Sequence, residues 1–338
     1  MSEVPPRGVS GAEWRRCWLP AVERLAAVPQ GYRRVDVGVR GAARILGVDE
    51  GAVRRLVAAG LPARAGGEGP LMDRYDLINL GLLSGSGRSV PEAAERRWTG
   101  QAAGPPGDWT APRALRLALS THCSVRCAGP PPASPPVASL ASGTTAVRRW
   151  RSLEPGGRVL ADVTLRGRSR RVRSRAAREV FDELYAALAA GRYRYARLPA
   201  ALAAAPERAL AAGVLDAVTA ALVMAGQARA AGLEARIRSG FLLGPGDVSY
   251  RSAALRHTWA EVREAGHWLP LDPVQAYRAA RNPGAHREFT DFCRGSRPNW
   301  LLPWAYGTPA APAPHPCAEG GRAVTSCRQL PPRHREEG

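Results

Sequence analysis

The stretch from residue 213 to residue 273 constrains the fold of this chain more than any other part. It opens with a strong helical pattern over residues 213–231, rich in alanine, valine and leucine. Three short runs follow at residues 233–243, 257–264 and 268–271, and each is typical of a strand. A helix followed by short strands predicts an α+β fold.

The chain before this stretch adds further predicted elements. Alternating residues predict strands at 113–122, 146–153 and 158–172, and Ser174 is a candidate N-cap for a helix that follows. Residues 84–112 are rich in glycine, proline and serine, which indicates a linker, and from residue 306 onward the chain is rich in proline, alanine and glycine. The predicted organisation is therefore an extension (1–31), a small domain (32–85), a linker (86–112), a large domain (113–305) and a flexible tail (306–338).

The small domain carries a helix-turn-helix pattern over residues 39–62, VRGAARILGVDEGAVRRLVAAGLP. Gly47 separates two short helices, Asp49 caps the second helix, and Gly60 ends it. The following residues, 63–76, suit a β-hairpin that leads into a further helix.

This segment resembles the winged-helix domains of the MerR and excisionase families. The resemblance implies that the second helix enters the major groove of DNA, with Arg54 and Arg55 as the DNA-binding residues. Only two arginines are candidates for contacting DNA bases. The alternative interpretation therefore stays open, that the segment is a degenerate helix-turn-helix that binds a peptide or only packs against its neighbour.

The large domain contains three matching pieces: Arg229–Arg236 after a helix, His257-Thr-Trp-Ala-Glu261 on a strand, and Trp268-Leu-Pro-Leu-Asp-Pro273. Together they resemble the transglutaminase-like superfamily, which has a papain-type arrangement of Cys, His and Asp. The resemblance implies that His257 and Asp272 are the catalytic base and its orienting carboxylate. The substrate implied is a peptide or peptide-like acyl compound.

Alternation places His257, Trp259 and Glu261 on one face of a strand, and we expect this face to point at the cleft. Trp268 is a further candidate for lining the cleft. A thiolate at a helix N-terminus would attack the acyl carbonyl in this chemistry, because the helix macrodipole lowers the pKa of the thiol.

The nucleophile is where the chain departs from the family pattern. The family's cysteine aligns with Ala217, and no cysteine occurs between Cys127 and Cys293. A methyl group cannot form an acyl-enzyme. Three alternatives stay open: a pseudoenzyme that binds its substrate, an active enzyme that uses His257 and Asp272 with an unusual nucleophile, and entry of a distant cysteine, for which Cys293 is the best candidate.

The formal net charge of +19 comes from 48 arginines and no lysine. An anionic partner and a compositional bias explain this charge equally well.

No apolar run approaches the length of a membrane span, and the N-terminus lacks the apolar region of a secretory signal. We therefore expect a cytoplasmic chain without membrane contact, with reduced cysteines.

Cys123 and Cys127 form the one closely spaced cysteine pair. The pair is similar to the cluster motif of radical SAM enzymes, but Pro130 occupies the position of the third cysteine. A zinc site would need two more soft ligands, such as Cys317 and Cys327. We expect neither a metal nor a cofactor.

The predicted function is that of a degenerate transglutaminase-like protein of peptide or natural-product maturation. A DNA-binding regulator with a ligand-sensing cleft is the further alternative.

Overall fold

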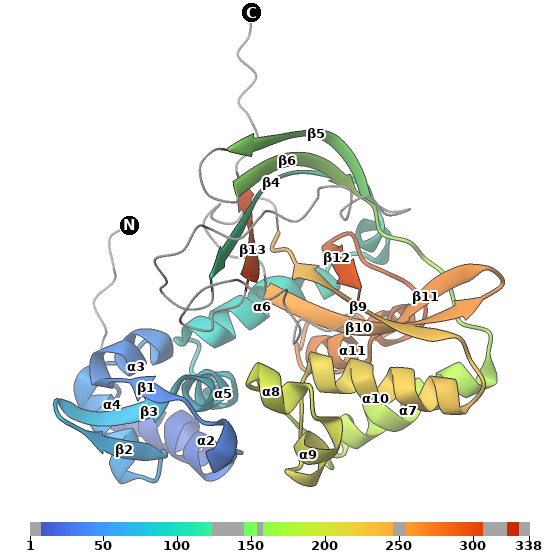
Figure 1. The fold of residues 1–338 in the computed structure, drawn as a ribbon. Coiled ribbons are helices and arrows are strands. Elements are labelled where there is room, and N and C mark those ends of the chain that lie inside the picture. The colour runs from blue at the N-terminus through green and yellow to red at the C-terminus, as the bar shows by residue number, and fades with distance from the viewer. Residues whose placement is uncertain (1–7, 124–144, 154–157, 246–254, 307–322, 331–338) are drawn as a thin grey trace, which may run out of the picture. The chain divides into compact units, whose positions relative to one another are not determined.

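A computed structural model describes residues 8–123, 145–153, 158–245, 255–306 and 323–330 (Figure 1). The chain divides into two compact units. The first unit combines the N-terminal residues up to Arg97 with the segment Ala187–Thr219, and the second unit contains Trp98–Ala186 and the chain from Ala220 onward. These limits do not coincide with the domain limits expected from the sequence.

The first unit contains the two helices expected around Gly47, α3 (Val39–Leu46) and α4 (Glu50–Ala58). Gly47 ends α3 in the left-handed conformation, with φ of 68°, and an added Cβ there would lie 2.4 Å from the Arg88 carbonyl oxygen. Asp49 caps α4 by accepting the Ala52 N–H at 2.7 Å. Both local features that the sequence predicts are therefore present.

A small antiparallel sheet and a third helix follow. The sheet has the order β1-β3-β2, with β1 at Val35–Val37, β2 at Ala63–Gly66 and β3 at Gly69–Asp73. Helix α5 (Arg74–Ser84) begins directly after β3. The Asp73 carboxylate caps α5 by accepting the N–H groups of Tyr75 and Asp76.

The N-terminal residues belong to the core of this unit rather than to a separate extension. They form α1 (Gly11–Glu13), a π-helical turn (Trp14–Trp18), α2 (Leu19–Glu23) and a 3-10 turn (Gln30–Tyr32). Trp18 is fully buried and shares one apolar core with side chains of α3, α4 and α5. The indole also donates to the Glu13 carboxylate at 3.3 Å.

The remaining part of the first unit is small. Strands β7 (Arg194–Tyr195) and β8 (Val214–Leu215) pair in parallel, and the helices α8 (Ala200–Ala203) and α9 (Pro206–Ala211) lie between them in the sequence. Leu202 is fully buried in the second core cluster of this unit.

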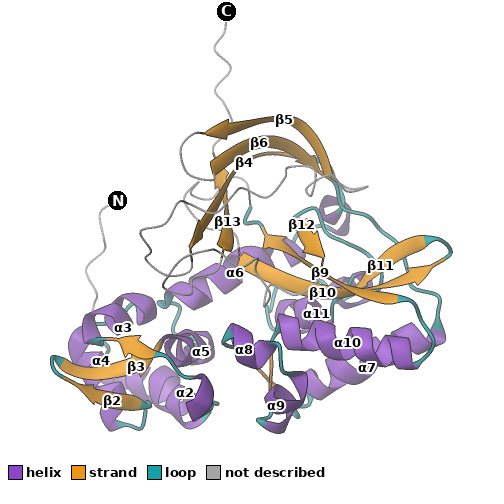
Figure 2. Ribbon diagram, in the orientation of Figure 1, coloured by secondary structure: helices purple, strands orange, loops and turns teal. Residues whose placement is uncertain are grey.

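The second unit holds the sheet that positions the candidate site. Its order is β11-β10-β9-β12, and all neighbouring strands are antiparallel. The strands are β9 (Ala235–Leu242), β10 (Leu255–Glu264), β11 (His267–Leu271) and β12 (Leu301–Tyr306). Figure 2 shows α7 (Arg175–Ala189) and α10 (Ala217–Ala230) running beneath this sheet.

The positions of β9, β10 and β11 agree with the three strands predicted from the sequence. Two short helices, α11 (Pro273–Ala280) and α12 (Glu288–Phe292), follow β11 in the chain. Ser174 caps α7, as predicted, by accepting the Ala177 N–H at 3.3 Å. The predicted strand at 158–172 is shorter in the structure, where β6 ends at Leu165.

A second antiparallel sheet in this unit has the order β13-β4-β6-β5 (Figure 1). Its strands are β4 (Arg113–Cys123), β5 (Thr145–Leu153), β6 (Arg158–Leu165) and β13 (Ala323–Leu330). Strand β13 corrects the prediction of a loose tail from residue 306 onward, because it pairs along β4. The Cys327 side chain on β13 is buried, and burial raises its pKa to about 12.

The predicted linker at 86–112 contains helix α6 (Val90–Ala102) and a 3-10 turn (Pro106–Trp109). Ser89 begins the helix, because its hydroxyl accepts the Glu92 N–H at 3.2 Å. Trp98 is buried, and the Arg278 guanidinium lies 4.3 Å from the centre of its ring. The linker prediction is therefore wrong over α6, where a capped helix buries Trp98 between glycine-rich flanks.

Among the described residues, no helix combines the length and the apolar character that a membrane crossing needs.

Candidate functional site

His257 and Asp272 form a buried pair in the second unit. His257 Nε2 lies 2.5 Å from Asp272 Oδ2, and the two side chains are 0% and 5% exposed. Strand β10 carries the histidine, and the aspartate directly follows β11, its antiparallel neighbour. The imidazole lies nearly parallel to the Trp259 ring, with an angle of 18° between the planes and centroids 6.2 Å apart.

The Asp272 carboxylate is held by more than the histidine. Asp272 Oδ1 caps α11 by accepting the Gln275 N–H at 2.9 Å. With its side-chain amide nitrogen facing the aspartate, Gln275 also donates to Oδ2 at 3.1 Å and accepts from Trp300 Nε1 at 3.2 Å. The carboxylate is therefore oriented toward His257 by a helix cap and an amide.

Sequence reasoning missed Gln275. The available signal was the spacing Asp272-Pro-Val-Gln275, which is a capping-box spacing with Asp at the N-cap and Gln three residues later.

The second nitrogen of the imidazole has no hydrogen-bond partner among the described residues. His257 Nδ1 is buried, and no protein group within that part of the chain contacts it as donor or acceptor. A carboxylate on Nε2 favours the tautomer with the proton on that nitrogen, which leaves the Nδ1 lone pair available. Chemically, Nδ1 can take a proton from a nucleophile while Asp272 stabilises the imidazolium that forms.

The predicted cleft-lining residues form a polar network on the same face of the sheet. Glu261 accepts from Arg236 Nε and Nη2, each at 2.7 Å, and from Trp259 Nε1 at 3.2 Å. The Arg236 guanidinium stacks over the Trp268 ring at 3.9 Å. Trp259 and Glu261 are 1% and 4% exposed, so they are buried in this network and do not border open solvent.

Ala217 is the first residue of α10 and is buried. Asp216 precedes it, and its carboxylate accepts the Thr219 N–H at 2.8 Å. Burial raises the pKa of Asp216. The first turn of a helix is the place at which the macrodipole stabilises a negative charge.

Cys293 lies beside Asp272, whose N–H donates to the Cys293 carbonyl oxygen at 3.2 Å. Burial, with a smaller contribution from the Asp272 charge, raises the pKa of the Cys293 thiol well above its usual range. Because the thiolate is the reactive form, this sulfur is not activated. Cys17 and Cys327 are buried too, whereas Cys127, Cys317 and the Cys123 side chain lie outside the described residues.

Arg54 and Arg55 are exposed on α4 in the first unit. Arg54 pairs with Glu50 at 3.4 Å, and the Arg55 guanidinium lies 4.9 Å from the centre of the Trp14 ring. Within the described residues, His, Cys, Asp and Glu form no group of three or more that could hold a metal ion.

Comparison with known proteins gives a family match for the part of the chain that contains His257 and Asp272. Residues 164–273 match the transglutaminase-like superfamily. This transglutaminase-like region contains β9, β10, β11 and α10 and ends one residue after Asp272. No curated protein matches the chain.

A solved structure from Cytophaga hutchinsonii, described as "a Putative Cysteine Protease", is also similar to this chain. The two are 10% identical, and the match covers 66% of this chain and 94% of the other, with a TM-score of 0.29.

Proposed function

We propose that this chain is a degenerate transglutaminase-like protein that binds a peptide-like acyl substrate and has lost the nucleophile at Ala217. The observation that carries the proposal is the buried pair of His257 and Asp272, in which Nδ1 of the histidine has no partner among the described residues. A histidine held in this way suits acyl transfer, because it is oriented and keeps one nitrogen for a proton.

The missing thiol supports the degenerate form of this proposal. Ala217 begins α10, where a thiol would gain from the helix macrodipole, and an alanine offers no nucleophilic atom. Cys293 does not replace it, since burial keeps that thiol protonated. A role in the maturation of a peptide or natural product fits a protein that keeps the His257–Asp272 pair for binding and lacks the thiol needed to form an acyl-enzyme.

Binding and turnover of labelled peptides test this proposal together. Fluorescein-labelled peptides are titrated with the protein and followed by polarisation, and the same mixtures are analysed by mass spectrometry with a primary amine present. We expect saturable binding without cleavage or amide exchange. Turnover that is lost in His257→Ala and kept in His286→Ala would overturn the degenerate form and favour an active acyltransferase or peptidase with an unusual nucleophile. The absence of both binding and turnover would contradict the proposal as a whole.

DNA binding is a second candidate function, favoured by the arrangement of α3 and α4. We propose that residues 32–85 form a winged helix-turn-helix module that places Arg54 and Arg55 against DNA, with the C-terminal region sensing a ligand. The tight turn at Gly47, the hairpin of β2 and β3, and the exposure of both arginines support this proposal.

Fluorescence anisotropy with duplex DNA at several salt concentrations tests this second proposal. We expect binding that weakens with salt, and a smaller salt dependence in the double variant Arg54→Ala, Arg55→Ala. Arg178→Ala together with Arg192→Ala removes the same charge from exposed positions outside residues 32–85 and serves as the control. No binding at low salt, or equal losses in the two double variants, would contradict it.

A further inference from the structure

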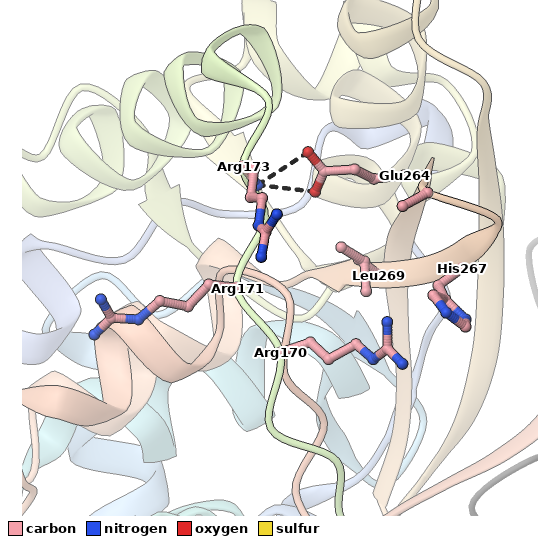
Figure 3. A pocket seen from close by; sticks show the side chains of 7 residues that line it. Arg170, Arg171, Arg173, Glu264, His267 and Leu269 are labelled. Carbon is pink, nitrogen blue, oxygen red and sulfur yellow. Dashed lines mark hydrogen bonds between the residues drawn. The ribbon is translucent and has the colours of Figure 1, made fainter.

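A pocket of about 400 Å³ lies at the end of the β10–β11 hairpin in the second unit (Figure 3). The hairpin contributes Glu264, Ala265, His267 and Leu269, and the segment before α7 contributes three arginines. Figure 3 shows the Arg170 side chain reaching toward His267 and the Arg171 side chain pointing away from both.

This pocket is on the opposite face of the sheet from the catalytic pair. Glu264 lies opposite His267 in the register, so their side chains share one face. Since side chains alternate along a strand, His257, seven residues before Glu264, points to the other face. At about 3.3 Å per residue, the two positions on β10 are roughly 23 Å apart. The pocket is therefore separate from the site described above.

The single carboxylate of the pocket is already used by the backbone. Glu264 accepts the Arg173 N–H at 2.8 and 3.1 Å with its two oxygens, and the Ser174 N–H at 2.7 Å. These bonds fix the carboxylate at the start of α7. Within the described residues, no acidic side chain lies within ion-pair distance of the guanidinium groups of Arg170, Arg171 or Arg173. The pocket consequently carries an excess of positive charge.

His267 adds a hydrogen-bond donor to this set. Arg168 Nη2 lies 3.3 Å from His267 Nδ1, and because a guanidinium can only donate, Nδ1 is the acceptor. The proton of the neutral ring is then on Nε2. Desolvation, and after it the charges of Arg170 and Arg168, lower the pKa of His267, so the ring is neutral near pH 7.

We propose that this pocket binds a phosphoryl group in its dianionic form. Two separate guanidinium groups, Arg170 and Arg173, and the Nε2–H of His267 supply donors from three side chains. A tetrahedral oxyanion has enough oxygens to accept from all of them, whereas one planar carboxylate is satisfied by a single guanidinium fork. A dianion also offsets the excess positive charge of the pocket.

Titration of the full chain with inorganic phosphate, followed by the NMR signals of its histidine side chains, tests this proposal. We expect a saturable shift of the His267 signals and a rise in the pKa of His267, since a bound dianion favours the imidazolium. His286 is the internal reference and should not respond. Sodium acetate at equal ionic strength should have no saturable effect. A second titration with a phosphoserine peptide separates the two sources, because tighter binding than inorganic phosphate would indicate a phosphorylated peptide.

Arg170→Ser and Arg192→Ser form a matched pair of variants, since both remove one exposed arginine. The loss of a charge-assisted hydrogen bond predicts a decrease in phosphate affinity of about tenfold or more for Arg170→Ser and little change for Arg192→Ser. Thermal unfolding checks that both variants are folded. An unshifted His267, an equal response to acetate, or equal losses in the two variants would overturn the proposal and leave only nonspecific attraction of ions.

Discussion

Asp272 accepts a hydrogen bond from the Gln275 N–H with one oxygen and lies 2.5 Å from His257 Nε2 with the other. A single carboxylate thus caps α11 and orients the histidine. Because the cap fixes the aspartate relative to the backbone, the position of the imidazole depends on the start of a helix as well as on the sheet. The pair is for this reason part of the fold, and its stability can be measured without a substrate.

Replacing Asp272 with alanine should destabilise the protein more than replacing it with asparagine. Alanine removes the cap, worth about 1 kcal/mol, and leaves the buried His257 Nε2 without its partner, which costs about 1–3 kcal/mol more. Asparagine keeps an oxygen for the cap, and its NH₂ group can donate to His257 Nε2 in the other tautomer of the imidazole. Urea unfolding at pH 7 measures the difference. Equal stability of Asp272→Ala and Asp272→Asn would show that the pair contributes little to the fold.

The Cys293 thiol should resist alkylation in the folded protein. Burial raises its pKa well above the usual range, so the thiolate fraction at pH 8 is very small. Peptide mapping after brief treatment with iodoacetamide should find Cys293 unmodified in buffer and modified in urea. Rapid modification in buffer would instead support Cys293 as a nucleophile beside Asp272.

Asp76 in the first unit should make stability depend on pH. It is fully buried, accepts the Val28 N–H at 2.8 Å, and burial raises its pKa to about 6. The unfolded chain has a pKa near 4 at this residue. Between pH 6 and pH 4 the folded state therefore binds a proton that the unfolded state does not, and stability rises as the pH falls.

The comparison with Asp76→Asn isolates this effect, since asparagine keeps an acceptor for Val28 and cannot ionise. The wild-type protein should gain up to about 3 kcal/mol of stability relative to the variant between pH 6.5 and pH 4. Parallel stability curves for the two proteins over this range would contradict the shifted pKa.

Local patterns predicted the strands β9, β10 and β11 because each short run is typical of a strand over its own residues. They could not predict β13, whose pairing with β4 joins residues about two hundred positions apart in the chain. Helix α6 was not predicted because its flanks are rich in glycine and proline, and its Trp98 contacts Arg278, a residue 180 positions later in the chain.

The site shows the same division between local and distant information. His257 and Asp272 followed from a family resemblance, and the structure brings them into contact. The burial of Trp259 and Glu261 did not follow from alternation, because the network with Arg236 covers that face of the sheet. The pocket proposed to bind phosphate could not be predicted from the sequence, because it depends on the register that sets Glu264 opposite His267.

The most direct test of the account restores a thiol at position 217. Iodoacetamide labelling of Ala217→Cys is followed against pH by peptide mapping, with Ala220→Cys as the matched control on the same helix and the His257→Ala background as the second control. We expect the new thiol at 217 to be labelled at pH 6, because a neighbouring imidazolium would hold it as the thiolate. This labelling should fall at least tenfold in the His257→Ala background and be absent at 220. A thiol at 217 that reacts no faster than the one at 220, or that reacts equally without His257, would contradict the claim that Ala217 occupies the nucleophile position of a retained acyl-transfer site.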